Sequence, residues 1–281
     1  MGTTGGLIVT VAPCIPSRMA GKLGGVDVSP EGIAREVVRA YNAGANMAHL
    51  HVWDGRGEPT TDLAAFERTL ALIQEQCDIV LEGSTGGVSQ LSSEQRSLSL
   101  LTGIEVASLN SGSVNYDGGV YVNSPDEIRY WAAEMKRREI KPNVAIFEVG
   151  MVANAMELAD EGLLDSPRLF TFVLGQRGAM PATPKNMLFL SESIPEGSIW
   201  TVAGHGGHDL VMSVLAISLG GHPRAGFEDN PFYRQDQQAE SNAQLIDRLV
   251  QLGRTLGREP ATPAEVRSML GLKPRRDGRV D

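Results

Sequence analysis

Short apolar runs alternate along most of the chain with longer stretches in which apolar residues recur every three or four positions. The short runs predict buried parallel strands, and the longer stretches predict amphipathic helices. The expected strands are Leu7–Ala12, Met47–Val52, Asp78–Gly83, Glu105–Leu109, Val144–Glu148, Leu169–Leu174, Ser198–Ala203 and Pro223–Gly226. The expected helices span residues 30–43, 61–76, 93–101, 125–138, 151–160, 184–193, 207–219 and 237–256.

Helix start signals support this segmentation. Ser29 and Thr183 each precede a proline, an arrangement that suits the cap and the first position of a helix. Ser124 and Thr262 are each followed three residues later by a glutamate, which is the pattern of a capping box. We therefore expect these four residues to cap helices.

The alternation of strands and helices predicts a parallel sheet. Eight such pairs in 281 residues favour a closed (β/α)8 TIM barrel, which takes about 250 residues, over an open doubly wound sheet. The Gly-x-Gly-x-x-Gly fingerprint of dinucleotide-binding folds is absent after the first strand. We expect residues 1–272 to form a single barrel domain, and residues 273–281 to form a C-terminal tail.

Charge and cysteine content narrow the classes of partner. The chain has 25 Lys and Arg against 34 Asp and Glu, a net charge of −9, which argues against nucleic acid or an anionic membrane as a partner. It contains no run of 18 apolar residues that would predict a transmembrane helix. Cys14 and Cys77 form no disulfide framework and no CxxC motif, so we expect reduced thiols in a cytoplasmic protein that acts on small molecules.

The carboxyl ends of the strands carry the candidate chemistry, because a barrel builds its active site there. His49 and His51 are two positions apart on a strand, so both imidazoles point to one side and suit a zinc ion. Glu228, after the last strand, is the best third ligand, and a three-ligand set leaves the open position of a catalytic zinc. The alternative is a pair of structural histidines satisfied by hydrogen bonds.

The third and fourth strands end in small polar residues. Backbone N–H groups in the glycine-rich turn after the third strand suit a carboxylate or a phosphate, although an ordinary turn has the same composition. The residues of this turn and of the end of the fourth strand are candidate substrate contacts: Ser84, Thr85, Gly86, Gly87, Ser108 and Asn110.

The closing strand adds charged candidates. Arg224 is expected to point inward and must then be paired, either with an acidic substrate or with a nearby carboxylate. Asp229 directly follows the proposed ligand and is a candidate general base, the alternative being a capping role. Trp53 is close enough to His51 to wall the pocket. The other histidines are expected to be structural: His205, His208 and His222.

Ten short motifs are specific in combination: His49-Leu-His51-Val, Ser84-Thr-Gly-Gly, Ser108-Leu-Asn-Ser-Gly-Ser, Phe172-Val-Leu-Gly, Pro181-Ala-Thr-Pro, Val202-Ala-Gly, Gly220-Gly-His-Pro-Arg224, Gly226-Phe-Glu-Asp-Asn230, Ser241-Asn-Ala-Gln-Leu and Ala261-Thr-Pro-Ala-Glu. With them the chain resembles the β-keto acid cleavage enzyme family from about Leu7 to Leu272. The first activity characterised in that family is the cleavage of 3-keto-5-aminohexanoate.

The resemblance implies a zinc-dependent (β/α)8 barrel, usually a homotetramer, with one zinc ion held by His49, His51 and Glu228. It implies an acyl transfer in which a β-keto acid and acetyl-CoA give acetoacetate and a new acyl-CoA. Asp229 matches the catalytic aspartate of the family, and Arg224 matches the arginine beside it. Substrate-contacting Ser/Thr positions of the family match Ser84 and Ser108.

Some positions depart from the family pattern. Ser17 lies after the first strand, where many relatives carry a glutamate. In the family member that cleaves 3-keto-5-aminohexanoate this glutamate faces the amino group of the substrate, so its absence here predicts a preference for neutral or anionic β-keto acids. Trp53 and Gly207 each stand where an arginine is usual, and Ala145 stands where an acid is common. These departures concern the identity of the substrate.

Glu82 shares the inward parity of Ser84 on the third strand. We expect it to replace the missing acid at position 145 as a counter-charge to Arg224, which makes it a third catalytic candidate beside Asp229 and Arg224.

Two other functions remain open from the sequence. A mononuclear zinc hydrolase on the same fold would also use a His-x-His pair, but hydrolases of that type recruit further histidines from strands five and six, which end here without any. A non-catalytic ligand-binding barrel is the other alternative, and the intact set of His49, His51, Glu228 and Asp229 weighs against it.

Overall fold

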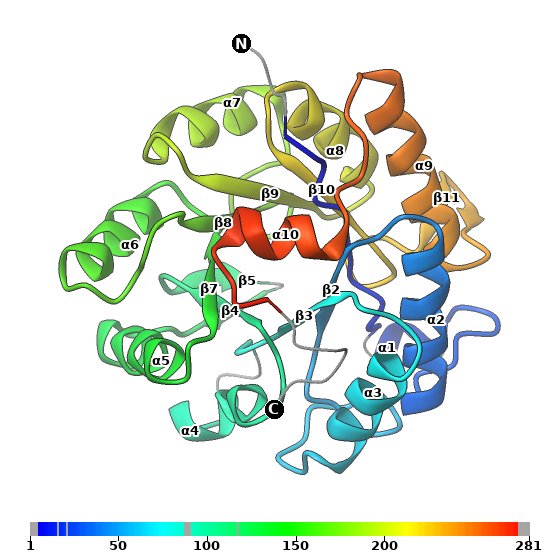
Figure 1. The fold of residues 1–281 in the computed structure, drawn as a ribbon, viewed down its shortest axis with the longest axis horizontal. Coiled ribbons are helices and arrows are strands. Elements are labelled where there is room, and N and C mark those ends of the chain that lie inside the picture. The colour runs from blue at the N-terminus through cyan, green and yellow to red at the C-terminus, as the bar shows by residue number, and fades with distance from the viewer. Residues whose placement is uncertain (1–4, 16, 21, 87–90, 117, 275–281) are drawn as a thin grey trace.

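The computed structural model describes residues 5–15, 17–20, 22–86, 91–116 and 118–274. Within them, eight parallel strands close into a barrel in the order β1-β10-β9-β8-β7-β4-β3-β2, and helices surround it (Figure 1). The barrel strands are β1 (Thr10–Val11), β2 (Met47–Leu50), β3 (Val80–Gly83), β4 (Val106–Asn110), β7 (Lys141–Ile146), β8 (Leu169–Leu174), β9 (Ile199–Gly204) and β10 (His222–Ala225). The predicted TIM barrel is confirmed.

The helices follow the strands in alternation, as predicted. They are α1 (Ser17–Ala20), α2 (Pro30–Asn42), α3 (Ala64–Gln74), α4 (Ser93–Arg96), the 3-10 helix η1 (Leu98–Leu101), α5 (Pro125–Arg137), α6 (Gly150–Asp160), α7 (Pro184–Ser193), α8 (Asp209–Ser218), α9 (Asn242–Thr255) and α10 (Pro263–Leu270). The four expected caps are confirmed, because each hydroxyl accepts the predicted backbone N–H: those of Ser29, Ser124, Thr183 and Thr262. None of the described helices has the length and apolar character needed to cross a membrane.

One end of the barrel is sealed by α10, which lies across it in Figure 1. Val266 and Leu270 of this helix pack in one cluster with the first residues of several strands, among them Met47, Val80 and Val106. These strand residues are fully buried. The sealed end is therefore the amino-terminal end of the strands, and a site can open only at the carboxyl end.

The first strand is shorter than predicted, since only Thr10–Val11 pair as β1. Side chains replace the missing ladder contacts: the backbone N–H of Ile8 donates to His222 Nδ1, and that of Val9 donates to Asn46 Oδ1. The chain there is fully buried, and on its other side the Val9 carbonyl accepts the backbone N–H groups of Asn46 and Met47.

Two antiparallel hairpins were not predicted. One pairs β5 (Val114–Tyr116) with β6 (Gly119–Tyr121), and the other pairs β11 (Phe232–Arg234) with β12 (Gln237–Gln238). The predicted helix over residues 237–256 was therefore wrong at its start, because Ser241 caps it and it begins at Asn242. The expected helix over residues 93–101 also divides, into α4 and η1.

His222 gives the fold a specific acid sensitivity. Burial, with Arg258 nearby, lowers its pKa to about 3, and its Nδ1 accepts the Ile8 N–H at 3.0 Å. The unfolded chain binds a proton at this residue below about pH 6.5 while the folded chain does not, so the free energy of unfolding falls as the pH drops toward 3. We expect His222→Asn, whose side-chain oxygen can replace Nδ1 as the acceptor, to lower the slope of the free energy of unfolding against pH. The expected decrease is up to about 1.4 kcal/mol per pH unit, measured by urea unfolding at several pH values. Equal slopes for the two proteins would contradict the prediction.

Candidate active site

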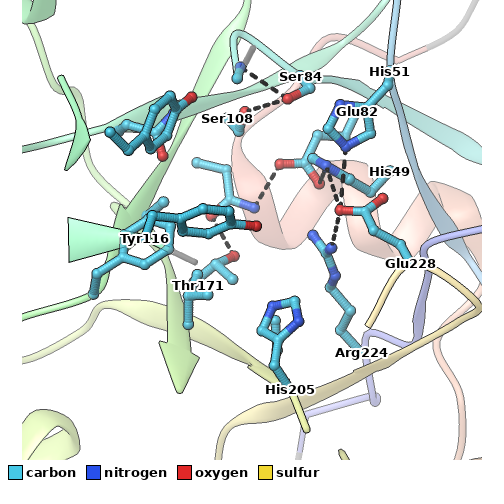
Figure 2. A pocket seen from close by; sticks show the side chains of 18 of the residues that line it. His49, His51, Glu82, Ser84, Ser108, Tyr116, Thr171, His205, Arg224 and Glu228 are labelled. Carbon is cyan, nitrogen blue, oxygen red and sulfur yellow. Dashed lines mark hydrogen bonds and ion pairs between the residues drawn. The ribbon is translucent and has the colours of Figure 1, made fainter. Parts of the chain in front are cut away.

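A cavity of about 460 Å³ opens at the carboxyl end of the barrel. Side chains from β2, β3, β4, β7, β8, β9 and β10 line it, as do residues of the β5–β6 hairpin. Figure 2 shows the labelled side chains converging on this space. Most of the predicted site residues meet here: His49, His51, Trp53, Glu82, Ser84, Gly86, Ser108, Asn110, Arg224 and Glu228.

His49, His51 and Glu228 form a compact cluster in the cavity, with one ligand atom of each within 4.8 Å of the others. Glu228 Oε1 lies 3.2 Å from His51 Nε2 and 3.6 Å from His49 Nε2. Close packing at Gly226 brings Glu228 to this position: a Cβ there would lie 2.0 Å from the Ala12 carbonyl oxygen, and the Glu228 N–H donates to that same oxygen. Only glycine allows this approach.

The cluster leaves buried polar atoms unsatisfied. Among the described residues, His49 Nδ1, His51 Nε2 and Glu228 Oε2 are buried and make no hydrogen bond, although two of them lie near carboxylate oxygens. Such atoms are costly to bury, and a bound cation would satisfy those that face it. Two imidazoles and one carboxylate are a donor set that zinc takes. The residues present therefore fit a divalent metal of the zinc type.

Arg224 is buried beside this cluster and pairs with two carboxylates. Its Nε and Nη2 donate to Asp229 Oδ2 and Oδ1, both at 2.9 Å, and Nη2 also donates to Glu228 Oε1 at 2.7 Å. Burial lowers the pKa of Arg224, but the two carboxylates outweigh it and raise the pKa. Burial likewise raises the pKa of Glu228, but the His51, Arg224 and His49 charges outweigh it and hold that pKa well below its usual range. The predicted pairing of an inward arginine is confirmed.

Asp229 lies behind Arg224, and its side chain is 0% exposed. His205 Nε2 approaches its Oδ1 to 3.6 Å. Asp229 itself is not among the residues that line the cavity, whereas Arg224 and His205 are. Its carboxylate therefore acts on the cavity through these two neighbours.

The expected contact between Glu82 and Arg224 is not formed. Glu82 Oε2 lies 3.2 Å from His49 Nδ1, and Oε1 accepts a 2.8 Å hydrogen bond from Asn143. The strand register explains this, because His49 of β2 is the direct neighbour of Glu82 on β3. β10, which carries Arg224, is separated from β3 by β1 and β2. The hydrogen-bonded counter-charges of Arg224 are Asp229 and Glu228, and Glu82 adds only a smaller Coulombic contribution that raises the pKa of Arg224.

Glu82 therefore contacts a histidine of the candidate metal site. A carboxylate beside a ligating histidine orients the ring, and removing such a partner typically costs 10- to 100-fold in metal affinity. We expect Glu82→Gln to weaken metal binding by about that factor, measured by competition with a chelator. The matched variant Glu58→Gln changes a lining glutamate that is exposed and should leave metal affinity unchanged. Equal affinities for Glu82→Gln and wild type would contradict this role.

The turn after β3 is organised by hydroxyl groups. The Gly86 N–H donates to Ser84 Oγ at 2.9 Å, and the Thr85 N–H donates to Ser108 Oγ at 3.2 Å. Ser84 and Ser108 line the cavity, as predicted. Thr85 is fully buried, and its hydroxyl donates to the Ser108 carbonyl, so it supports the turn rather than lining the cavity. Gly87 lies outside the described residues.

Three further candidates have different surroundings. The Asn110 amide donates to the Tyr121 hydroxyl, which also accepts from Arg96. Trp53 stacks on His51 with ring centroids 4.7 Å apart, so it walls the cavity as expected. Ser17 is the first residue of α1, and its side chain lies outside the description.

Several lining residues were missed from the sequence. His205 was expected to be structural, yet it lines the cavity, and burial lowers its pKa. Asn143 lies one residue before the predicted start of its strand, although its alternation with Ala145 places both side chains inward. Tyr116 and Tyr121 come from the hairpin that was not predicted. The remaining two histidines, His208 and His222, do not line the cavity.

Comparison with known proteins agrees with this site. A family model described as beta-keto acid cleavage enzyme matches residues 6–272. The chain is 40% identical to a 3-keto-5-aminohexanoate cleavage enzyme of Fusobacterium nucleatum over 95% of this chain and 98% of the relative. It is 36% identical to a 3-oxoadipate:acetyl-CoA acetyltransferase of Cupriavidus necator over 83% of each protein. It is 27% identical to a 3-dehydrocarnitine:acetyl-CoA trimethylamine transferase of Rhizobium meliloti, over 89% of this chain and 91% of that protein.

Among solved structures, the barrel is similar to that of ObcA without ligand, with a TM-score of 0.74 and 21% identity. The similarity covers 88% of this chain but only 65% of ObcA, and at this identity it shows the fold alone. The sequence matches go further, since the family model spans nearly the whole chain. The chain therefore belongs to the beta-keto acid cleavage enzyme family.

Proposed function

We propose that this enzyme transfers an acyl group between a β-keto acid and acetyl-CoA, giving acetoacetate and a new acyl-CoA. The observation that carries the proposal is the cluster of His49, His51 and Glu228 beside Arg224 in a cavity of substrate size, in a chain of this family. The names of relatives support the co-substrate, because several are acetyl-CoA transferases acting on β-keto acids.

The reaction balances without an external oxidant or reductant. A base removes a proton from C2 of the β-keto acid, and C2 forms a bond to the acetyl carbon as the CoA thiolate leaves. The thiolate then bonds to C3 of the substrate, and the C2–C3 bond breaks. The electron pair left on C2 takes back the proton, which gives acetoacetate and an acyl-CoA that carries the original tail.

The proposed cofactor is one zinc ion per chain, held by His49, His51 and Glu228. When bound, it supplies Lewis-acid stabilisation to negative charge on the keto oxygen. Arg224 presents a second positive charge to the same part of the cavity, fixed by its bidentate contact with Asp229. Asp229 is the proposed base; because its carboxylate is buried, it exchanges the proton through His205, whose Nε2 lies 3.6 Å from Oδ1.

The proposed carboxylate contacts come from the turn after β3. Ser84 Oγ accepts the Gly86 N–H, which orients the hydroxyl so that its own hydrogen can be donated to a substrate carboxylate. Ser108 and Asn110 end the next strand and line the same face of the cavity. The backbone of Gly87, the side chain of Ser17 and the wall formed by Trp53 remain proposed substrate contacts.

The test is a panel of β-keto acids assayed with and without acetyl-CoA, with metal analysis of the same sample. The proposal predicts acetoacetate and an acyl-CoA in equal amounts, and only when acetyl-CoA is present. A zinc hydrolase would instead release the free acid from its substrate without CoA. A ligand-binding barrel would turn over nothing.

We also propose a homo-oligomer, a tetramer on the family resemblance. Large apolar side chains are exposed on the neighbouring helices α7 and α8: Leu188, Phe189 and Val211 are 45%, 49% and 54% exposed. Apolar surface of this kind is suited to contact with a second copy of the chain. Light scattering of the purified protein gives the mass directly. Action in the cytoplasm also remains a proposal, in keeping with the free thiols of Cys14 and Cys77.

A further inference from the structure

The cavity has two chemically different sides. The charged side chains and the two lining serines come from β2, β3, β4 and β10 and from the turns that follow them. The opposite side comes from β7, β8 and β9 and the residues that follow them. Four of its lining side chains are apolar and buried, Ala145, Phe147, Val173 and Ala203, and three are polar, Asn143, Thr171 and His205. A β-keto acid likewise has a polar end, with its carboxylate and keto oxygens, and a tail that varies.

Strand register places two members of the apolar wall side by side. Val173 on β8 is the direct neighbour of Ala203 on β9, and Ala145 on β7 is the neighbour of Thr171 on β8. The polar residues of β7 and β8 bond to one another and to β3: Thr171 donates to Asn143, and Asn143 donates to Glu82. Their hydrogen-bonding groups are thus directed along the barrel interior rather than toward a ligand at the wall.

Two tyrosines extend the wall toward the cavity mouth. The ring centroid of Tyr116 lies 5.9 Å from that of Tyr121 and 6.4 Å from that of Phe147. The Tyr116 hydroxyl accepts from Gln176, and the Tyr121 hydroxyl accepts from Arg96 and Asn110. Figure 2 shows Tyr116 across the cavity from His49, Arg224 and Glu228. The aromatic carbon surface therefore lies on the same side as the aliphatic wall.

The charges of the described lining residues lie on the polar side. The cation is Arg224, which is already paired with Asp229 and Glu228. Glu82 lies against His49, and Glu58 belongs to the loop beside Trp53. An anionic tail on the apolar side would meet no free cation among these residues, and a cationic tail would meet no carboxylate.

We propose that the tail of the substrate is uncharged and apolar, an inference that rests on the proposed function. The tail packs against the apolar wall, below Tyr116 and Tyr121; the wall consists of Ala145, Phe147, Val173 and Ala203. The enzyme then transfers an aliphatic acyl group to CoA. Aromatic faces also attract a cation, so a trimethylammonium tail is the main competitor. A neutral group of the same shape keeps the dispersion contacts without losing ionic hydration, so it is favoured on a wall without a carboxylate.

Pairs of substrates with matched shape test the proposal directly. 5-Methyl-3-oxohexanoate has the shape of 3-keto-5-aminohexanoate without its charge, and 5,5-dimethyl-3-oxohexanoate has that of 3-dehydrocarnitine. 6-Methyl-3-oxoheptanoate similarly matches 3-oxoadipate. With acetyl-CoA and metal-loaded enzyme, we expect kcat/KM for the neutral member to be at least about tenfold higher in all three pairs. A preference for the charged member of any pair, or near-equal values, overturns the proposal.

A binding measurement separates this proposal from the proposed reaction. The same pairs are titrated without acetyl-CoA, with Trp53 in the cavity as a fluorescent reporter. Tighter binding of the neutral members without turnover of any compound would refute the reaction and support the apolar tail site. Turnover of β-keto acids with tighter binding of the charged members would support the reaction and refute the tail site.

A variant of the wall gives an independent check. Val173→Thr conserves shape and adds a hydroxyl to the wall, so the preference for the neutral member of each pair should fall severalfold. Val38→Thr makes the same change at a half-buried position on α2, away from the cavity, and should leave the preference as in wild type. If both variants keep the wild-type preference, Val173 does not contact the tail and the proposal is wrong.

Discussion

His49→Ala and His51→Ala are each expected to abolish metal binding and acyl transfer while leaving the barrel folded. Each removes one of the three proposed ligands from a cluster whose atoms lie within 4.8 Å of one another. The remaining two ligands hold zinc poorly, because stable catalytic sites use three protein ligands. The measurements are metal content by mass spectrometry, activity, and unfolding followed by circular dichroism.

His208→Ala is the matched control for these variants. His208 is exposed at the start of α8, makes no side-chain cap there and does not line the cavity. It should retain wild-type metal content and activity. Purified wild-type enzyme without near-stoichiometric divalent metal, and with no gain of activity on adding zinc, would contradict the assigned metal site.

Asp229→Asn is expected to lower kcat by roughly 100- to 10,000-fold while metal stays bound, which is the range for loss of a positioned acid–base group. The carboxylate accepts two hydrogen bonds from Arg224 and lies 3.6 Å from His205, both of which line the cavity. The amide removes the negative charge and one acceptor. Arg224 then loses the bidentate partner that fixes its position.

Asp209→Asn separates this effect from a general loss of structure. Asp209 is also a buried aspartate paired with an arginine, Arg248, but it lies outside the cavity lining. Both variants should lose stability in urea, and only Asp229→Asn should lose kcat by the stated factor. Comparable rate losses in the two variants would show that Asp229 acts through folding alone.

Periodicity predicted the barrel because each strand needs only its own residues to be recognised. Leu169–Leu174 is apolar at every position but Thr171, and the structure has the strand at those same bounds. The β5–β6 hairpin has exposed or half-buried residues on most of its length, so it carries no apolar pattern. The predicted start of α9 was misplaced because Gln237 and Gln238 are polar, and a polar pair fits the edge of a hairpin as well as the first turn of a helix.

Site residues were predicted correctly where the alternation of side chains along a strand, or a position at the end of a strand, was enough to place them. His49 and His51 share a face, and Glu228 follows the closing strand, so the three meet whatever the details of register. The direct contact predicted between Glu82 and Arg224 is not formed, because parity gives the direction of a side chain but not its neighbour. The order of strands puts His49 beside it and places Arg224 on a more distant strand.

The carbon transfer itself provides the most direct test of the proposed reaction. Acetyl-CoA with both acetyl carbons labelled with carbon-13 is supplied with an unlabelled aliphatic β-keto acid and metal-loaded enzyme, and the products are read by NMR. Acyl exchange predicts label at C3 and C4 of acetoacetate, none at C1 and C2, and an unlabelled acyl-CoA in equal amount. Release of free acid without acyl-CoA, or no labelled acetoacetate from any β-keto acid, would contradict it.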